Sequence, residues 1–243
     1  MKVFKSIIFI YTLFTLKASA QEFNKSINKD SLLKTIVRDM PNDKKDEFLK
    51  TYNSGDEKAK EFLLFMLSMP KSSKKKLIAN IDSNYANIYK LKTEYAKLVP
   101  KNLNVRIEFN PANNIISTKE DIDIRVQEVE QDGNRKVTQN WNLAYNSPKL
   151  DKMLALIKWN TETLKIIKKL LNNANCVSIE NDKITTIGFA RSGLGKYSYL
   201  VFDSNLTPEQ IKAYTDGCGN IFYKQNIVLL FEGGAVGAQC FPD

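Results

Sequence analysis

The sequence predicts an α+β protein, with a helical N-terminal part followed by a mainly antiparallel sheet with one long packed helix. From Asp30 to Val99, apolar residues recur at three- and four-residue spacing, which is typical of one buried helix face. After Pro100 the period changes to two, which is typical of antiparallel strands with one exposed face. This change of period indicates either a domain boundary or the start of the sheet within one continuous domain.

The N-terminal pattern predicts several helices in residues 21–100. Asp30 caps the first helix and Pro41 ends it. The predicted helices are Asp30–Met40, a short one around Phe48–Tyr52, Glu57–Met69, and a longer one from Leu77 to Leu98. The third is apolar nearly all round and is expected to be central.

Residues 101–243 form the predicted α+β region. Three strands are expected first, at Val105–Phe109, Ile122–Gln127 and Val137–Tyr145. Asp132-Gly133 is a good hairpin turn between the second and the third. Within the third strand, the alternation predicts one shared face for the larger apolar side chains, which are Val137, Trp141, Leu143 and Tyr145.

The long helix follows these strands, and a second group of strands follows the helix. Ser147-Pro148 opens the helix, whose apolar face continues to Leu171. The later elements are strands at 177–180, 184–190, 197–202, 221–225 and 227–231, with a short helix at 208–214. The run from Ile227 to Phe231 is apolar on both faces, which predicts a central strand.

The first twenty residues are expected to be a cleavable signal peptide. Lys2 and Lys5 precede an apolar stretch of about ten residues, which is too short for a permanent membrane helix. Ala18-Ser19-Ala20 then predicts cleavage between Ala20 and Gln21. The mature protein is expected to be secreted or periplasmic and soluble, with no stable membrane insertion after signal cleavage.

Composition excludes several classes of site. The chain has no histidine, which excludes a catalytic triad containing histidine and the usual zinc sites with histidine ligands. Three cysteines are too few for an all-cysteine zinc site, so neither a metal nor a cofactor is expected. Only five of the 36 basic residues are arginine, which argues against a nucleic-acid partner.

The three cysteines predict one disulfide and one free thiol in an oxidising compartment. Cys218 with Cys240 is the favoured pair, because the segment between them resembles two strands that return the chain to its starting point. Cys176 with Cys240 is nearly as plausible.

Two glycine-containing loops are the candidate site, one at Arg191–Tyr197 and one at Glu232–Gln239. The first joins two strands, so an ordinary hairpin is expected there rather than a phosphate-binding loop. If the strands are neighbours, Arg191, Tyr197 and Glu232 are expected to form a recognition surface. Glu232 with Asp203 could form a carboxylate pair of the glycosidase type, although a solvated strand end is the default expectation for both.

The leading hypothesis is therefore a non-catalytic binding protein for another protein or an envelope polymer. One alternative is an inhibitor or immunity protein against an exported hydrolase, acting through a loop such as Ser192–Tyr197. The other alternative is a carboxylate-based glycan hydrolase. No residue is assigned a catalytic role, because none of the patterns requires one.

Overall fold

The computed structural model describes residues 23–129, 135–234 and 237–243. These residues divide into two compact units. One comprises the described residues up to Phe65 together with Asn113–Thr118, and the other comprises Met66–Ala112 and the described part of Lys119–Asp243. The predicted signal peptide, its cleavage position after Ala20 and the predicted turn at Asp132-Gly133 lie outside the described residues.

The first unit is helical. It contains α2 (Lys29–Arg38), α3 (Asn42–Ser54) and most of α4 (Glu57–Ser68). The cap of α2 is Asn28, whose side chain accepts from the Ser31 backbone amide, so the cap lies two residues before the predicted Asp30. The small core of this unit is built on Phe23, Tyr52 and Leu64.

The second unit contains a sheet of eight strands, all paired antiparallel, which confirms the predicted α+β class. Its order is β3-β2-β1-β4-β5-β6-β8-β7. The strands are β1 (Leu103–Asn110), β2 (Asp121–Val129), β3 (Arg135–Ala144), β4 (Ser178–Glu180), β5 (Thr185–Ser192), β6 (Gly195–Val201), β7 (Asn220–Lys224) and β8 (Ile227–Glu232). The apolar strand β8 pairs on both sides, as its sequence predicts.

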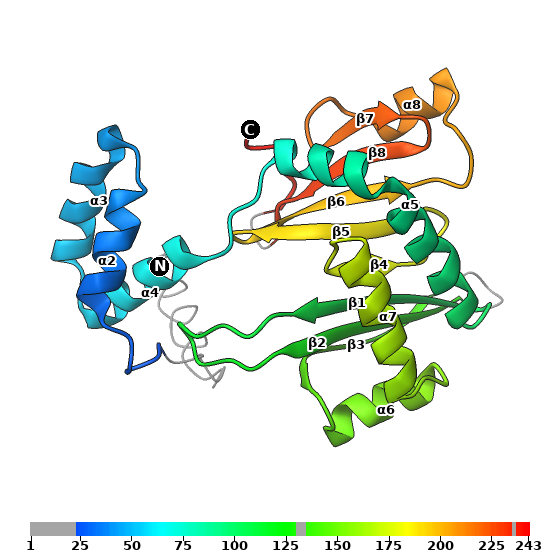
Figure 1. Ribbon diagram of the computed structural model, residues 1–243, viewed down its shortest axis with the longest axis horizontal. Coiled ribbons are helices and arrows are strands. Elements are labelled where there is room, and N and C mark those ends of the chain that lie inside the picture. Colours follow the sequence, from blue (N-terminus) through cyan, green and yellow to red (C-terminus); the bar gives the residue numbers. More distant parts are fainter. Residues whose placement is uncertain (1–22, 130–134, 235–236) are drawn as a thin grey trace, which may run out of the picture. The chain divides into compact units, whose positions relative to one another are not determined.

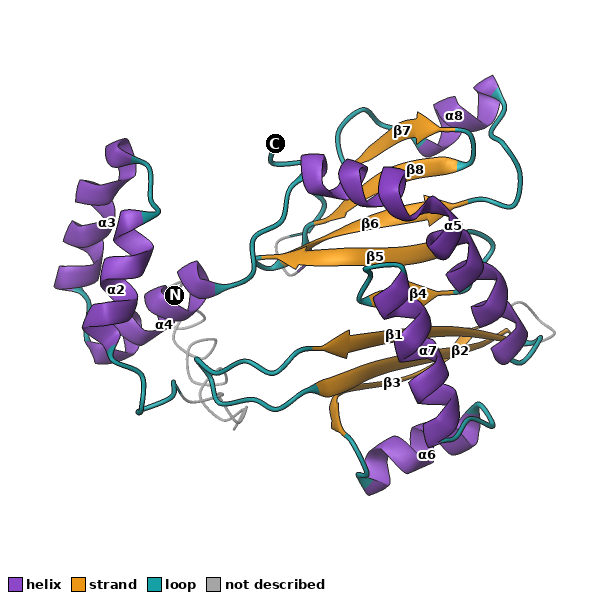
Figure 2. Cartoon of the chain, in the orientation of Figure 1, coloured by secondary structure: helices purple, strands orange, loops and turns teal. Residues whose placement is uncertain are grey.

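Three helices lie over one face of this sheet, as Figures 1 and 2 show: α5 (Lys74–Leu98), α6 (Pro148–Leu156) and α7 (Thr161–Asn173). The helix predicted from Pro148 to Leu171 is thus two helices. Lys158 has a positive φ of 55°, which no α-helix can contain, so α6 ends before it. A new helix then begins at Thr161, where the Asn160 side chain caps α7 by accepting from the Thr163 amide. The short helix α8 (Pro208–Tyr214) contacts β7. Within the described residues, no helix is long and apolar enough to cross a membrane.

The outer face is the face of the sheet that points away from α5, α6 and α7. Along β1, Val105 and Ile107 are buried in the core beneath the helices. Because side chains alternate along a strand, Arg106 and Glu108 point to the outer face. The same alternation sends Lys196 and Ser198 of β6 outward.

Strand β3 differs from its predicted pattern. Val137 and Trp141 are 50% and 59% exposed, whereas Leu143 is only 2% exposed. The pairing with β2 shifts between Ile122 and Ile124, and Asn142 takes a positive φ of 52°. This bulge reverses the alternation, so the expectation of one shared apolar face is wrong. Asn140 contacts Met153 of α6, which leaves Val137 and Trp141 on the outer face.

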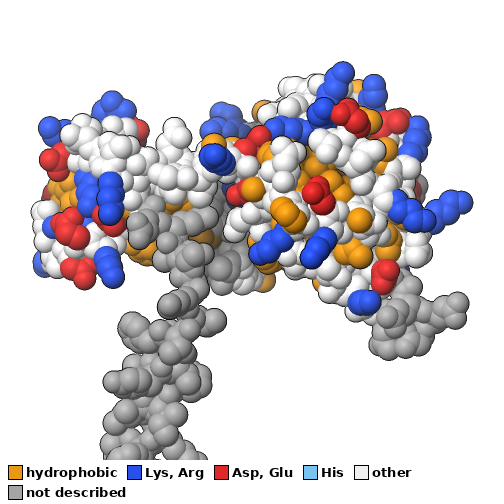
Figure 3. Space-filling model, turned by 90° about the horizontal axis from the view of Figure 1, so that it is seen from below, with side chains coloured by type: hydrophobic (Ala, Val, Ile, Leu, Met, Phe, Trp, Pro, Cys, Tyr) orange, Lys and Arg blue, Asp and Glu red, His pale blue; other side chains and the backbone are white. Residues whose placement is uncertain are grey.

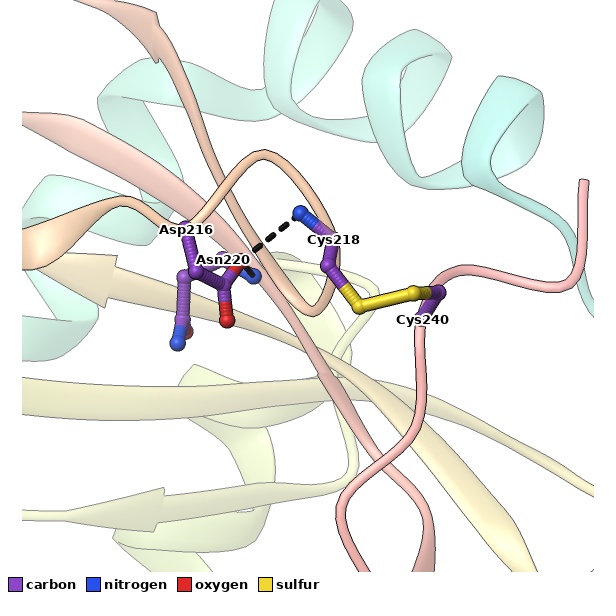
Figure 4. Close-up of a disulfide and its surroundings, with 4 residues drawn as sticks. All are labelled: Asp216, Cys218, Asn220 and Cys240. Atoms are coloured by element: carbon purple, nitrogen blue, oxygen red, sulfur yellow. Dashed lines mark hydrogen bonds between the residues drawn. A yellow bond between two sulfur atoms is a disulfide. The ribbon is translucent and has the colours of Figure 1, made fainter.

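A disulfide joins Cys218 to Cys240, which confirms the favoured pairing, and Cys176 is a buried free cysteine. Figure 4 shows Asp216 beside the bridge, where its carboxylate accepts from the backbone amides of Cys218 and Asn220. The tail beyond the bridge is held at further points. The backbone amide of Phe241 donates to the Cys218 carbonyl, and Asp243 accepts from the Lys74 amide at the start of α5.

Candidate functional site

Five charged side chains meet on the outer face, from strands that are distant in sequence. This ion cluster consists of Arg106, Glu108, Arg191, Lys196 and Glu232, from β1, β5, β6 and β8. Glu108 lies at its centre, with Arg191 Nη2 at 2.7 Å, Lys196 Nζ at 3.3 Å and Arg106 Nη2 at 3.4 Å from its oxygens. The side chains of Lys196 and Glu108 are only 5% and 2% exposed.

Lys196 lies between two carboxylates. Its Nζ is 3.4 Å from Glu232 Oε2 as well as 3.3 Å from Glu108 Oε2. Glu232 Oε2 also accepts a hydrogen bond of 2.7 Å from the Ser198 hydroxyl. Arg106 Nη1 is 4.0 Å from Glu232 Oε1, so Arg106 also contacts both acids. Each carboxylate is therefore held by more than one donor.

Gly188 leaves room for the aliphatic part of the Lys196 side chain, here called the lysine stem, to pass over β5. A Cβ at this position would lie 2.1 Å from Ser178 Oγ and 3.2 Å from Lys196 Cδ. The stem occupies this space, and its Nζ reaches 3.3 Å from Ser178 Oγ on the far side. Any larger residue at position 188 would therefore force the side chains of Ser178 and Lys196 to shift.

The cluster keeps Glu108 ionised. Burial alone raises the pKa of this carboxyl, but the charges of Lys196, Arg191 and Arg106 outweigh it, and the pKa lies below its ordinary value. A carboxyl in this state accepts hydrogen bonds at neutral pH and does not donate a proton. The geometry therefore suits recognition better than general acid catalysis.

Arginine is concentrated on this face. Arg38 belongs to the first unit, and the other four arginines lie on strands of the sheet. Arg106 and Arg125 are direct cross-strand partners, an arrangement of like charges that is unfavourable without neighbouring acids. Arg125 pairs with Glu180, while its buried Nε has no hydrogen-bond partner among the described residues. Arg135 of β3 lies with its Nη1 3.5 Å from Asp182 Oδ2.

Two of the three predicted recognition residues, Arg191 and Glu232, belong to the ion cluster. They are joined through Glu108 and Lys196, which the sequence analysis missed. Tyr197 lies elsewhere, so this part of the expectation is wrong. It is 1% exposed on the helix-covered face, where its hydroxyl donates to Asp243 Oδ1 at 2.8 Å. The alternation along β6 explains the difference, because Tyr197 stands between two outward residues.

The two glycine-containing loops lie together. The first is a hairpin between β5 and β6, as expected, with Gly193 at a positive φ of 57°. A Cβ on Gly234, which starts the second loop, would lie 2.1 Å from the Leu194 carbonyl oxygen. The first loop and the described start of the second therefore lie at the end of the sheet that carries Arg191 and Glu232.

Asp203 and Glu232 lie at opposite ends of their strands. Glu232 pairs with Lys196 at the start of β6, whereas Asp203 follows the other end of that strand. Seven residues of extended chain span roughly 23 Å, far beyond the separation of about 5 to 9.5 Å that glycosidases use. Asp203 instead binds Lys92 at 2.6 Å. Asp203 and Glu232 therefore do not form a glycosidase-type pair.

In residues 23–129, 135–234 and 237–243, no group of three or more His, Cys, Asp or Glu side chains is placed to hold a metal ion. Comparison with protein-family models, with curated proteins and with solved structures finds no match to this chain.

Proposed function

We propose that this protein is a binding protein whose outer face recognises another protein. The observation that carries the proposal is the ion cluster, in which two carboxylates and three cations already satisfy one another. Such a network presents fixed hydrogen-bonding groups to a partner. It does not provide the separated acid and base that a hydrolase uses.

A protein partner is favoured over a polyanionic polymer. The arginines of the outer face are matched by acids, so this face does not have the uniform positive field that attracts polyanions. Figure 3 shows another side of the molecule, on which acidic, basic and hydrophobic side chains of the described residues are also interspersed. Exposed Trp141 and partly exposed Arg191 are the residue types that dominate protein–protein interfaces.

An extracytoplasmic location is part of the proposal. The Cys218–Cys240 disulfide supports it, because such bonds persist in oxidising compartments. The predicted signal sequence supports it independently.

The test uses the mature protein as bait against the extracytoplasmic fraction of its source. A double variant, Arg106→Gln with Arg191→Gln, should capture the partner about ten-fold or more weakly, because interface arginines contribute strongly to binding. The matched control is Arg38→Gln, which changes an exposed arginine of the first unit. Equal capture by the double variant would refute the role of the cluster.

A parallel assay addresses catalysis. Wild-type protein and the variant Glu232→Gln are incubated with envelope glycans, and the release of reducing ends is measured. We expect no turnover by either protein. Turnover by wild-type protein that the variant lacks would overturn the proposal in favour of a hydrolase.

A second candidate function, an inhibitor, is favoured by the tip of the β5–β6 hairpin. Leu194 is 40% exposed there, and the backbone beside it is anchored. The Gly193 amide donates to the Pro70 carbonyl at 2.9 Å, and Ser192 Oγ accepts from the Ser72 amide at 3.1 Å. A fixed loop with an exposed leucine suits insertion into an enzyme cleft. Inhibition of an exported glycosidase, protease or nuclease that Leu194→Glu abolishes would support this candidate.

A further inference from the structure

A pocket of about 360 Å³ lies on the helix-covered side of the sheet, apart from the ion cluster. It is formed by α5, the turn after α7, and β5. Its polar lining is dominated by side-chain amides, and Phe189 provides an apolar wall. Its lining includes Ala79, Asn80, Ser83, Asn84, Asn175 and Phe189.

Asn80 fixes the orientation of the other two amides. It is buried, and its Oδ1 accepts from Asn84 Nδ2 at 2.9 Å and from Asn175 Nδ2 at 3.0 Å. Its own Nδ2 donates to the Ala174 carbonyl and to the Tyr199 hydroxyl, both at 3.2 Å. The amide of Asn80 is thus fully used, and its role is to position Asn84 and Asn175.

The backbone is irregular at both of these positions. Asn84 interrupts α5, with φ of −121° and ψ of 17°. Asn175 takes a positive φ of 50°, a left-handed conformation that asparagine tolerates better than most residues. Both residues place their side-chain amides where helical structure is interrupted, Asn84 within α5 and Asn175 directly after the C-cap of α7.

The pocket offers hydrogen-bonding groups that are already in place. No other described residue donates to the Oδ1 atoms of Asn84 and Asn175, and Ser83 adds a hydroxyl. Lys76 is the only charged residue in the lining. An amide that both donates and accepts matches neighbouring hydroxyls, each of which does the same. The apolar wall at Phe189 matches the C–H face of a sugar ring.

We propose that this pocket binds one uncharged sugar residue of a glycan, through the amides of Asn84 and Asn175 and the wall of Phe189. The volume lies at the lower end of the range for small-molecule sites, roughly 300 to 1,000 Å³, and suits a single ring. The site is distinct from the protein-binding outer face, and either can exist without the other.

The probes are a neutral N-acetylhexosamine disaccharide, a neutral glucose trisaccharide and, as the competing ligand class, the peptide Ala-Ala-Ala. Each is titrated into isotope-labelled mature protein, and the side-chain amide signals of Asn84 and Asn175 are followed by NMR. We expect saturable shifts with at least one sugar and none with the peptide. Saturation by the peptide alone, or no saturation by either sugar, would overturn the proposal.

Variants separate the site from the fold. Asn84→Ala should weaken sugar binding about ten-fold, the value of one well-placed hydrogen bond. Asn173→Ala, an exposed change at the end of α7 outside the lining, should leave binding unchanged. Ala79→Trp fills the pocket from an exposed position of α5 without removing a polar contact, so it should abolish binding at unchanged thermal stability. Undiminished binding by a folded Ala79→Trp protein would refute the assignment.

Discussion

At the scale of single residues, Glu108 carries the strongest prediction about stability. Glu108→Gln replaces the carboxylate shared by three cations with a neutral amide and leaves Lys196 buried with only Glu232 as a counter-charge. Losing one member of a buried ion network costs about 3 to 5 kcal/mol. Urea denaturation measures this loss. The matched control, Glu162→Gln, changes an exposed ion pair and should cost at most about 1 kcal/mol.

The same residue should make stability depend on acid. The pKa of Glu108 is lower in the folded protein than its ordinary value, so its ionised form is stabilised by folding. Its contribution is therefore present above the ordinary carboxyl pKa and is lost as the pH falls through the folded value. The stability difference between wild-type protein and Glu108→Gln should shrink in acid. A difference that stays constant at every pH would contradict the ionic explanation.

The sequence identified Arg191 and Glu232 because each lies beside glycines at a strand end. The sequence could not predict that Glu108 and Lys196 lie in contact, since this contact depends on the order of the strands in the sheet. Glu108 lies on β1 and is separated from β5 by β4, which joins the sheet only after α7. Tyr197 could have been excluded, because the alternation along its own strand already assigns it to the other face.

At the scale of elements, the sequence predicted strands well where their alternation was clean. It failed at β3, where one left-handed residue, Asn142, reverses the pattern without any glycine to signal it. It also joined α6 to α7, because the apolar spacing continues across the break at Lys158. Both errors come from single-residue backbone conformations, which side-chain periodicity does not record.

The C-terminal tail is held by one covalent bridge in addition to its hydrogen bonds. Cys218→Ser should lower the free energy of unfolding by about 2 to 4 kcal/mol, because it opens the loop closed by the disulfide. Urea denaturation measures the loss, and wild-type protein in reductant is the control, since it should be destabilised equally.

Thiol counting of unfolded, unreduced wild-type protein should give one free thiol. In the native state the count should be none, because Cys176 is buried and its pKa is raised to about 12. A count of three would refute the disulfide.

At the scale of the whole molecule, the change of period after Pro100 was enough to predict the fold class. It could not show that α5 packs against the sheet, because an apolar helix stripe does not identify its partner. In the structure, α5 contacts α7, β5 and β6 within the second unit. The strand order could not be predicted either, since β4 pairs with β1 and β8 pairs with β6, which are distant from them in sequence.

Export is the prediction that concerns the whole chain. Protein recovered from outside the cytoplasm should begin at Gln21, because Ala18-Ser19-Ala20 has the small residues that signal peptidase accepts. Intact-mass measurement gives the answer directly. An alanine-to-arginine change at the cleavage position, Ala20→Arg, should prevent processing. Recovered protein that retains Met1–Leu16 would contradict the prediction.

The packing of the Lys196 side chain over Gly188 restricts which substitutions can be accepted during the evolution of this protein. A side chain at position 188 would meet Ser178 Oγ as well as the Lys196 side chain, so it becomes tolerable only after both of these neighbours have shifted or changed. Once the lysine is lost, the buried charge of Glu108 is less well compensated, and selection should then favour a neutral residue there. Descendants of a common ancestor should therefore keep glycine, lysine and glutamate at these three positions together, or replace them together.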